Sequence, residues 1–297
     1  MNRGIWSAVA AYTLWGWFPV YFKWLAQVPA LELIGHRIVW SCLMLGVAIV
    51  LMRQWPAFRA HTLRLRVIRS YLLAAMLISV NWLVYVWAVN SGFILDASLG
   101  YFINPLISVL MGVLLLHERL RPWQWVAVSL AMLGVAYLTF AHGSLPWIAL
   151  TLAFSFALYG LIKKKSQLGA LHGLTLETGI LLLPALAYLF SLEGNGQGAF
   201  LHAGTRIDML LIGCGLVTAA PLLLFASAAK RIPLALLGVL QYIAPTLQFL
   251  IAILIYQEPF AMDKLIGFGI IWVALFIFAI EGLLARRTPA EPAAELM

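Results

Sequence analysis

The chain alternates long apolar runs with short polar connections. A helix needs about 20 mostly apolar residues to cross the hydrocarbon core of a membrane. The runs of about this length are 5–23, 33–52, 70–90, 97–116, 122–141, 146–162, 173–191, 208–229, 234–256 and 264–284. The pattern therefore predicts an all-α, polytopic membrane protein with ten transmembrane helices.

Polar residues interrupt the fourth apolar run at a helical spacing. The residues at positions i, i+3, i+4 and i+7 of one helical face are Tyr101, Asn104, Pro105 and Ser108. A polar side chain that faces lipid is costly, so this face should meet the protein interior or water.

The same pattern recurs 140 residues later without a gap. The segment YFINPLISVLMGVLLLHE begins at Tyr101, and QYIAPTLQFLIAILIYQE begins at Gln241. In this alignment Pro105 falls on Pro245. The two prolines form a matched pair of candidate hinges, because proline frees a backbone carbonyl and permits a kink.

The repeat divides the chain into two halves of five predicted helices. A weaker match supports the division, since LWG at 14–16 corresponds to LYG at 158–160. The expected repeats are 1–141 and 142–285, followed by a short tail, 286–297. Because five is odd, the second half must enter the membrane from the opposite side, and inverted repeats are typical of secondary transporters.

The composition agrees with a membrane protein and predicts its orientation. Of the residues, 64% are hydrophobic and 10% are charged, against about 45–50% and 25% in soluble domains. The net charge of +8 does not require nucleic acid as a partner, because membrane proteins collect Lys and Arg in cytoplasmic loops. With the N-terminus inside, 15 of the 19 Lys and Arg lie on the inner side. We therefore expect both termini in the cytoplasm.

Eleven polar or aromatic residues are candidates for a substrate-binding surface at membrane depth. They are Tyr12, Trp15, Asn81, Tyr85, Tyr101, Asn104, Ser108, Tyr159, Gln241, Tyr242 and Gln248. The alternative for the polar residues is hydrogen bonding between helices, which contributes only about 0.6 kcal/mol for each bond on average. The alternative for tryptophan is the aromatic belt at the membrane interface.

Four ionisable residues are candidates for substrate or proton handling. They are Glu32, His36, Arg37 and Glu177. An ionisable group inside a membrane is a functional hypothesis by default. The alternatives are that Arg37 extends to the outer interface and that Glu177 pairs with a lysine of 163–165.

The motifs of enzymes and nucleotide-driven pumps do not occur in the sequence. It contains no GxxxxGK[ST], no HExxH and no GxSxG. Its two cysteines are far apart, and its histidines have no spacing typical of metal ligands. We expect no catalytic residue, no metal and no cofactor.

Several short segments together resemble a known family. They are LWGWFPVYFK, ELIGHRIVWS, YFINPL, HERL, QYIAPT and the Gln257–Glu258 pair. They resemble the RarD family of bacterial inner-membrane permeases, in the EamA group of the drug/metabolite transporter superfamily. The resemblance implies ten helices in two inverted halves, with helices 1, 3, 4, 6, 8 and 9 around a central cavity and helices 5 and 10 behind. It also implies export or exchange of small metabolites or drugs.

The sequence as a whole predicts a secondary transporter in the bacterial inner membrane. Its partners would be a small organic solute, the lipid bilayer and protons, and it would work by alternating access. A homodimer is compatible with the small residues Ala127, Ala131, Gly134, Gly267 and Gly269, which permit close helix packing, although packing within one chain explains them equally well. A membrane-embedded enzyme and an accessory or sensor protein are the alternatives.

Overall fold

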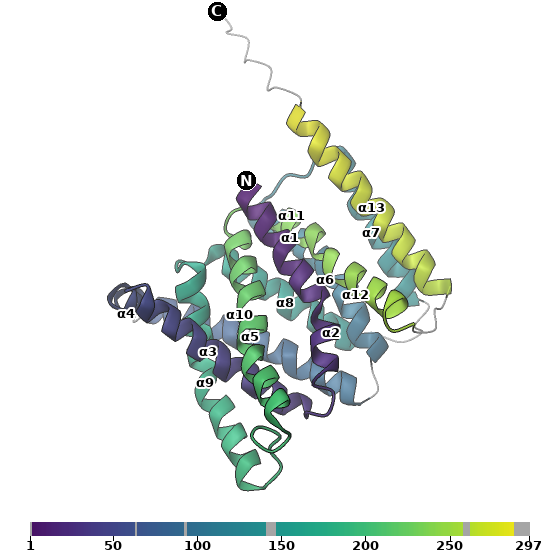
Figure 1. The fold of residues 1–297 in the computed structure, drawn as a ribbon. Coiled ribbons are helices and arrows are strands. Elements are labelled where there is room, and N and C mark those ends of the chain that lie inside the picture. Colours follow the sequence, from purple (N-terminus) through teal and green to yellow (C-terminus); the bar gives the residue numbers. More distant parts are fainter. Residues whose placement is uncertain (1, 63, 92–93, 141–146, 258–261, 288–297) are drawn as a thin grey trace, which may run out of the picture.

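The computed structural model describes residues 2–62, 64–91, 94–140, 147–257 and 262–287. The regular structure of these residues is entirely helical, and none of them forms a strand (Figure 1). The prediction of an all-α fold is therefore confirmed for the described part of the chain.

The helices up to residue 140 correspond to the first predicted repeat. They are α1 (Asn2–Gly16), α2 (Phe18–Lys23), α3 (Ala30–Leu51), α4 (Trp55–Thr62), α5 (Leu65–Asn90), α6 (Ile94–Leu116) and α7 (Pro122–Phe140). Helix α4 lies in a segment that the apolar pattern leaves as a loop, and it carries Arg59 and His61 in its last turn. Its low apolar content is the reason that a search for membrane-spanning runs does not find it.

The remaining helices correspond to the second predicted repeat. They are α8 (Trp147–Lys165), α9 (Ala170–Gly194), α10 (Thr205–Ala229), α11 (Leu234–Gln241), α12 (Ile243–Leu254) and α13 (Met262–Arg287).

Two of the predicted continuous helices are broken in the structure. The first run divides at Trp17 into α1 and α2, and Pro19 is the second residue of α2. The ninth run divides at Tyr242 into α11 and α12, and Pro245 is the third residue of α12. Each proline lacks the N–H that would continue the hydrogen-bond ladder across the break. Helix α6, in contrast, continues through Pro105.

Six described segments are long and apolar enough to cross a membrane. They are Ala30–Leu51, Leu65–Ala88, Trp147–Lys165, Ala170–Gly194, Thr205–Ala229 and Leu234–Ile251. Two shorter apolar helical segments are Gly100–Leu116 in α6 and Gly269–Gly282 in α13.

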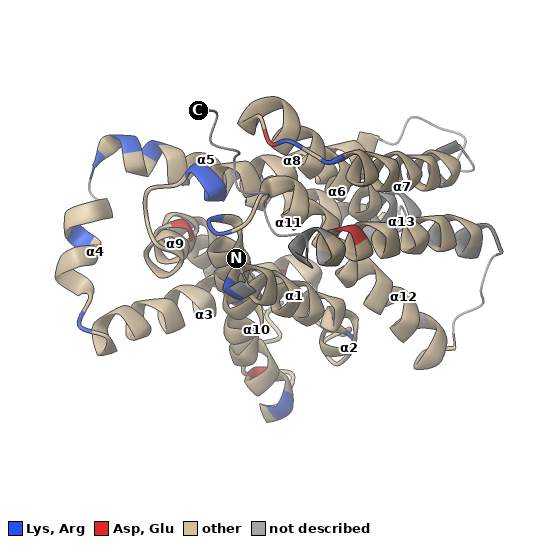
Figure 2. Cartoon of the chain, turned by 90° about the horizontal axis from the view of Figure 1, so that it is seen from above, with Lys and Arg blue, Asp and Glu red and all other residues tan. Residues whose placement is uncertain are grey.

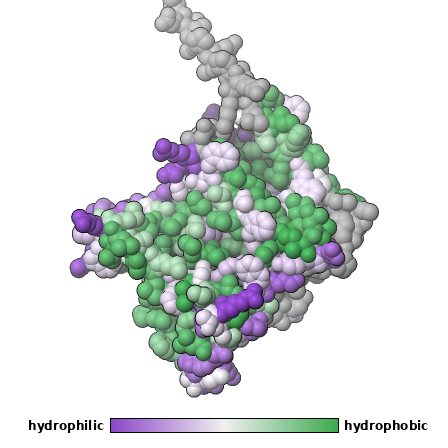
Figure 3. All heavy atoms as spheres, in the orientation of Figure 1, coloured by the Kyte–Doolittle hydropathy of each residue, from purple (hydrophilic) through white to green (hydrophobic). Residues whose placement is uncertain are grey.

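The surface of the molecule is that of a membrane protein. Apolar residues cover the middle of the face in Figure 3, and the polar residues lie toward its edges. Leu183, Phe190 and Leu254 are each more than 70% exposed. Exposed apolar area on this scale is rare on soluble monomers. Basic residues colour α4, the start of α5 and the end of α8 when the molecule is seen from above (Figure 2).

Helices α7 and α13 pack together along one edge, and α3 and α9 pack together at the opposite side (Figure 1). A methyl group placed on Gly134 of α7 would lie 3.2 Å from the carbonyl oxygen of Gly267 in α13. Ala127 and Ala131 also pack inside the chain, in apolar clusters with residues of α13. Packing within one chain therefore accounts for these four small residues.

The centre of the molecule is an apolar and aromatic core. Tyr12, Tyr159 and Phe225 are almost completely buried in it. Their rings lie close together, since the Phe225 ring centre is 6.3 Å from that of Tyr12 and 6.0 Å from that of Tyr159. This core joins α1 to α8 and α10 beside the cavity described next.

Candidate functional site

A cavity of about 250 Å³ lies between the helices of both halves. Its lining residues are Tyr12, Trp15, Phe18, Pro19, Phe22, Arg37, Ile78, Asn81, Trp82, Tyr85, Gly100, Tyr101, Asn104, Leu152, Phe156, Leu222, Gln241, Ala244, Pro245 and Gln248. Helices α7, α9 and α13 contribute none of them. The cavity is of the size that holds a small organic molecule.

The cavity collects most of the substrate-binding candidates. Those that line it are Tyr12, Trp15, Asn81, Tyr85, Tyr101, Asn104, Gln241 and Gln248. Pro245, a candidate hinge, and Arg37, a candidate for proton or substrate handling, line it as well. Their roles stay predictions, but their common location is now established.

Aromatic rings form much of the wall. The ring centre of Trp15 lies 5.6 Å from that of Tyr12 and 5.7 Å from that of Phe156. At another part of the wall, Tyr85 and Tyr101 meet edge to face at 5.8 Å. The candidates omitted Phe156, although the match of LWG to LYG places it opposite Tyr12 in the repeat. That alignment is a signal that could have found it.

The amide side chains of the wall differ in how they are bonded. Asn81 Nδ2 donates to the Leu152 carbonyl at 2.9 Å and to Ser155 Oγ at 3.0 Å. Gln248 Nε2 donates to the Trp15 carbonyl at 3.1 Å. These two residues therefore line the cavity and also tie helices together. Gln241 is 7% exposed, and its side chain makes no hydrogen bond to any described residue.

Arg37 carries the one charge on the described wall of the cavity. Its Nε donates to Thr218 Oγ1 at 2.9 Å. Its Cζ lies 4.5 Å from the ring centre of Trp82 and 5.4 Å from that of Phe22. None of the described carboxylates pairs with it. The guanidinium is thus held by aromatic faces and one hydroxyl group, not by an ion pair.

Three other substrate-binding candidates do not line the cavity. Ser108 Oγ donates to Asn104 Oδ1 at a long 3.4 Å, behind the wall. Tyr242 donates its hydroxyl hydrogen to the Phe102 carbonyl at 3.1 Å. Tyr159 donates to Glu177 Oε2 at 3.1 Å, in a separate buried cluster.

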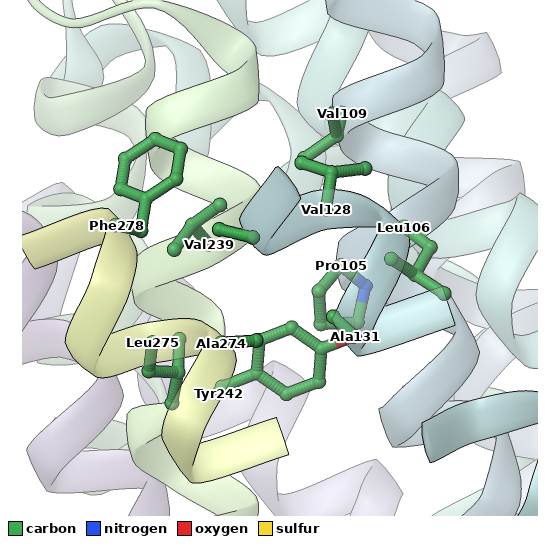
Figure 4. A pocket seen from close by; sticks show the side chains of 11 residues that line it. Pro105, Leu106, Val109, Val128, Ala131, Val239, Tyr242, Ala274, Leu275 and Phe278 are labelled. Atoms are coloured by element: carbon green, nitrogen blue, oxygen red, sulfur yellow. The ribbon is translucent and has the colours of Figure 1, made fainter. Parts of the chain in front are cut away.

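Tyr242 and Pro105 instead line a second, apolar pocket of about 10 Å³ between α6, α7, α11 and α13 (Figure 4). The other side chains around this pocket are Leu106, Val109, Ala127, Val128, Ala131, Val239, Ala274, Leu275 and Phe278. A space of this volume holds no more than about one water molecule. It is a packing gap and has no room for a solute.

Glu177 belongs to a sealed charged cluster. Lys163 Nζ donates to Glu177 Oε1 at 2.6 Å, and both side chains are 2% exposed. The same ammonium lies 5.4 Å from the ring centre of Tyr71 and 5.3 Å from that of Tyr159. The pairing with a lysine of 163–165, which the sequence left as an alternative, is present.

Glu32 and His36 face the connection between α9 and α10 rather than the cavity. Glu32 Oε1 accepts hydrogen bonds from the backbone N–H of Ala199 at 2.7 Å and of Phe200 at 3.3 Å. His36 Nε2 lies 3.7 Å from the same oxygen, and Trp40 Nε1 donates to His36 Nδ1 at 3.3 Å. Glu32 Oε2 is buried and has no hydrogen-bond partner among the residues that the structure describes. Arg37 therefore faces the cavity, whereas its neighbours Glu32 and His36 face this connection.

Glu118 joins the two halves at the other end of the molecule. Its carboxylate accepts from the backbone N–H of Leu234 at 2.7 Å and of Ala235 at 2.8 Å. Lys164 Nζ lies 3.5 Å from Glu118 Oε1 and donates to the Ile232 carbonyl at 2.6 Å. A carboxylate at a helix N-terminus satisfies free N–H groups and complements the helix dipole.

Within the described residues, no group of three or more His, Cys, Asp or Glu side chains could hold a metal ion.

Comparison with known proteins gives one family. The model of the EamA-like transporter family matches residues 2–140. The chain is 46% identical to "Uncharacterized transporter YojE" of Bacillus subtilis, over 96% of both chains. It is 44% identical to "Protein RarD" of Escherichia coli, over 96% of this chain and 97% of that one.

A solved crystal structure has the same fold. It aligns with a TM-score of 0.70 at 20% sequence identity, over 97% of this chain and 99% of the other. "Protein RarD" of Streptomyces exfoliatus is 45% identical over 97% of this chain and 92% of that one. Identity of 44% to 46% to these relatives over nearly the full length confirms the resemblance that the motifs indicated. The protein is a membrane protein of a transporter family: it belongs to the RarD group of the EamA-like transporters.

Proposed function

We propose that the protein is a secondary transporter that moves a small organic solute across the bacterial inner membrane by alternating access. The observation that carries this proposal is the cavity, because residues of both predicted halves line it and eight of the eleven substrate-binding candidates are among them. The names of the relatives support transport rather than catalysis.

We propose further that ten membrane-crossing helices form two inverted repeats, 1–141 and 142–285. The packing of the helices supports this arrangement. The counterparts in the two repeats would be α3 and α9, α5 and α10, α6 and α11–α12, and α1–α2 and α8. If each helix is replaced by its counterpart, one main helix contact turns into another contact that the structure also has. The contact of α6 with α8 becomes that of α12 with α1, and the contact of α5 with α8 becomes that of α10 with α1. The hydrogen bond from Tyr242 to Phe102 joins residues 140 positions apart.

The cavity lies toward one end of the bundle. Its lining comes from the end of α1, the start of α3, the second half of α5 and the starts of α6 and α8. Glu118 and Lys164 close the opposite end through their bonds to the start of α11. With cytoplasmic termini, this conformation is closed on the inner side, and opening it inward requires the Glu118 carboxylate to leave α11.

The two candidate hinges are in different states, which supports an exchange between repeats. The helix is broken close to Pro245 but continuous through Pro105. In inverted repeats, the opposite conformation is reached when each half takes the shape of the other. We propose that the inward-open state breaks α6 near Pro105 and straightens the junction near Pro245.

The energy for transport would come from a gradient. Proton coupling through Glu177, Glu32 or His36 remains part of the proposal, and so does a homodimer. Counterflow of labelled solutes in proteoliposomes, with and without an imposed pH gradient, tests transport directly. A panel of amino acids, nucleosides, organic acids and aromatic drugs is suitable, and no counterflow with any of them would contradict the proposal.

Cysteine labelling tests whether water reaches the cavity. In a background with Cys42 and Cys214 replaced by serine, a water-soluble thiol reagent added to intact cells should label Tyr101→Cys and Gln241→Cys. Val109→Cys is the matched control, because Val109 lies on α6 in the dry apolar core. Equal protection of all three positions would remove the cavity from the transport pathway.

A further inference from the structure

The unpaired charge of Arg37 bears on the class of solute. Arginine has five N–H donors in a planar fork, and only Nε has an acceptor among the described residues, the Thr218 hydroxyl. A charge that is removed from water without a partner is costly, so natural proteins pair it or leave it facing solvent or ligand. Here the guanidinium borders the cavity.

The surroundings of Arg37 orient the fork but do not neutralise it. Trp82, Phe22 and Phe18 lie around the guanidinium, with ring centres 4.5, 5.4 and 5.9 Å from Cζ. Aromatic faces attract a cation and restrict its motion. They do not accept hydrogen bonds from the N–H groups that point outward in the plane of the guanidinium. A planar carboxylate can accept two of these hydrogens side by side.

A second polar group also has free hydrogen-bonding capacity. Gln241 is 7% exposed, lines the cavity and makes no side-chain hydrogen bond to a described residue. Among the described residues, only Glu32 Oε2 is a buried side-chain polar atom without a partner, so the Gln241 amide reaches the cavity, where water or a ligand can bond it. Arg37 and Gln241 come from different halves of the chain, so a solute that bonds both would join them.

The other side chains of the wall indicate the chemical nature and the size of the rest of the solute. Trp15, Phe156, Tyr85 and Tyr101 present aromatic surface, which suits a ring through stacked or edge-on contacts. The volume of about 250 Å³ lies near the lower end of the range for small-molecule sites. The solute is therefore compact.

The charges on the wall exclude other classes. No carboxylate is among the described lining residues, so an ammonium group would meet repulsion from Arg37 and find no counter-charge. A phosphate ester carries nearly two charges at neutral pH, and the described wall offers one cation for it. We propose that the transported solute is a small aromatic monocarboxylate without an amino group, held by Arg37 through its carboxylate.

This inference rests on the proposed transport function, but binding tests it separately. The probes share one skeleton: 3-phenylpropanoate, 3-phenylpropanamide, 3-phenylpropylamine and phenylalanine. Calorimetric titration of the purified full-length protein at pH 7.5 should show the acid binding at least about tenfold more tightly than the other three, as expected for a charge-assisted hydrogen-bonded pair. This ranking requires no variant, so it does not depend on how a variant folds.

Substitution of the arginine then assigns the effect. Arg37→Gln should weaken binding of the acid by about 10- to 100-fold and binding of the amide by less than about threefold. The affinity of Arg37→Lys for the acid should lie between those of the unchanged protein and Arg37→Gln, because lysine offers a point charge in place of the planar guanidinium. Arg206→Gln, at an exposed arginine in the first turn of α10, is the control and should change neither affinity.

The outcomes separate the two proposals. Equal affinities of acid, amide and amine, an acid affinity that Arg37→Gln leaves unchanged, or no binding of any probe would each overturn the inference. If the acid binds through Arg37 but never exchanges across proteoliposomes, the transport proposal fails and the binding site stands. If neutral or cationic solutes are transported independently of Arg37, transport stands and the inference fails.

Discussion

Two charges inside this protein, Arg37 and Glu177, differ in their burial and in their partners: Arg37 is half-buried, and Glu177 is almost completely buried. Arg37 borders a cavity and keeps most of its donors free of described residues. Glu177 is sealed with Lys163 at 2.6 Å and receives a further hydrogen bond from Tyr159. Both are on the second long helix of their half, and both were candidates for the same role.

The comparison shows that a charged residue inside the protein is a candidate for solute binding only if it borders a cavity and lacks a charged partner. A paired carboxylate and ammonium form a nearly neutral unit whose desolvation is offset by their attraction, so the pair can persist in an apolar core. A cation at a cavity keeps access to water or to a solute. We therefore propose solute recognition for Arg37, and the coupling role proposed for Glu177 is tested against a purely structural role of the Glu177–Lys163 pair.

The largest expected effect is on stability, at the sealed pair. Glu177→Gln leaves the Lys163 ammonium buried without its counter-charge and should destabilise the protein by about 3–5 kcal/mol. Arg37→Gln, the matched comparison, loses one neutral-acceptor hydrogen bond and should cost about 1 kcal/mol. Denaturant or thermal unfolding in one detergent measures both.

The double variant Glu177→Leu with Lys163→Met distinguishes a structural role of the pair from a role in coupling. Removal of both partners should recover most of the stability lost in Glu177→Gln, because no charge is left unpaired. If the double variant folds but loses all gradient-driven transport, the pair has a coupling role. Retained transport would assign it to structure alone.

An intermediate effect is expected at Glu118, whose charge is satisfied by a helix end instead of a side chain. Glu118→Gln should weaken the cap by about 1–2 kcal/mol. This change should shift the equilibrium between the closed and the open conformation of that end toward the open one by about tenfold. Spin labels at the exposed positions 119 and 231 should then show a larger fraction of molecules in which the two labels are far apart. Unchanged distance distributions would contradict the proposed gate.

Gly112→Ala provides an independent test of the same contact. A Cβ at this position would lie 2.6 Å from Glu118 Oε2 and 2.9 Å from the Ala235 nitrogen. The carboxylate must therefore move, and the same shift in distances should follow without any change of charge. Gly46→Ala, where a Cβ meets no atom within 4 Å, is the control.

The smallest effect is expected at an exposed pair, Glu193 and His202, 2.8 Å apart. The hydrogen bond to the carboxylate raises the pKa of His202 above its ordinary value. The stabilisation is thus complete below the ordinary histidine pKa of about 6.5 and is lost as pH rises through the raised value. Glu193→Gln should lower the melting temperature by less than about 2 °C at pH 5.5 and by nothing at pH 9. A larger decrease in melting temperature at pH 9 than at pH 5.5 would contradict this prediction.

The sequence by itself determined the helical class, the internal similarity at an offset of 140 residues and the main polar residues of the cavity wall. Apolar runs of about 20 residues require helices in a membrane, and a stripe at helical spacing identifies the face that avoids lipid. Tyr101, Asn104 and Gln241 were found in this way. Those features are local in the chain, which is why the pattern was sufficient.

Only the tertiary structure decided which neighbour each polar face meets. The sequence made Tyr159 and Tyr242 candidates for the cavity, but in the structure they bond to Glu177 and to the Phe102 carbonyl instead. The tertiary structure also decided that the chain breaks beside Pro245 and continues through Pro105. The physical reason is that the apolar pattern shows which face of a helix avoids lipid, whereas the partner of each polar side chain lies on another helix, 18 positions away for Tyr159 and 140 for Tyr242.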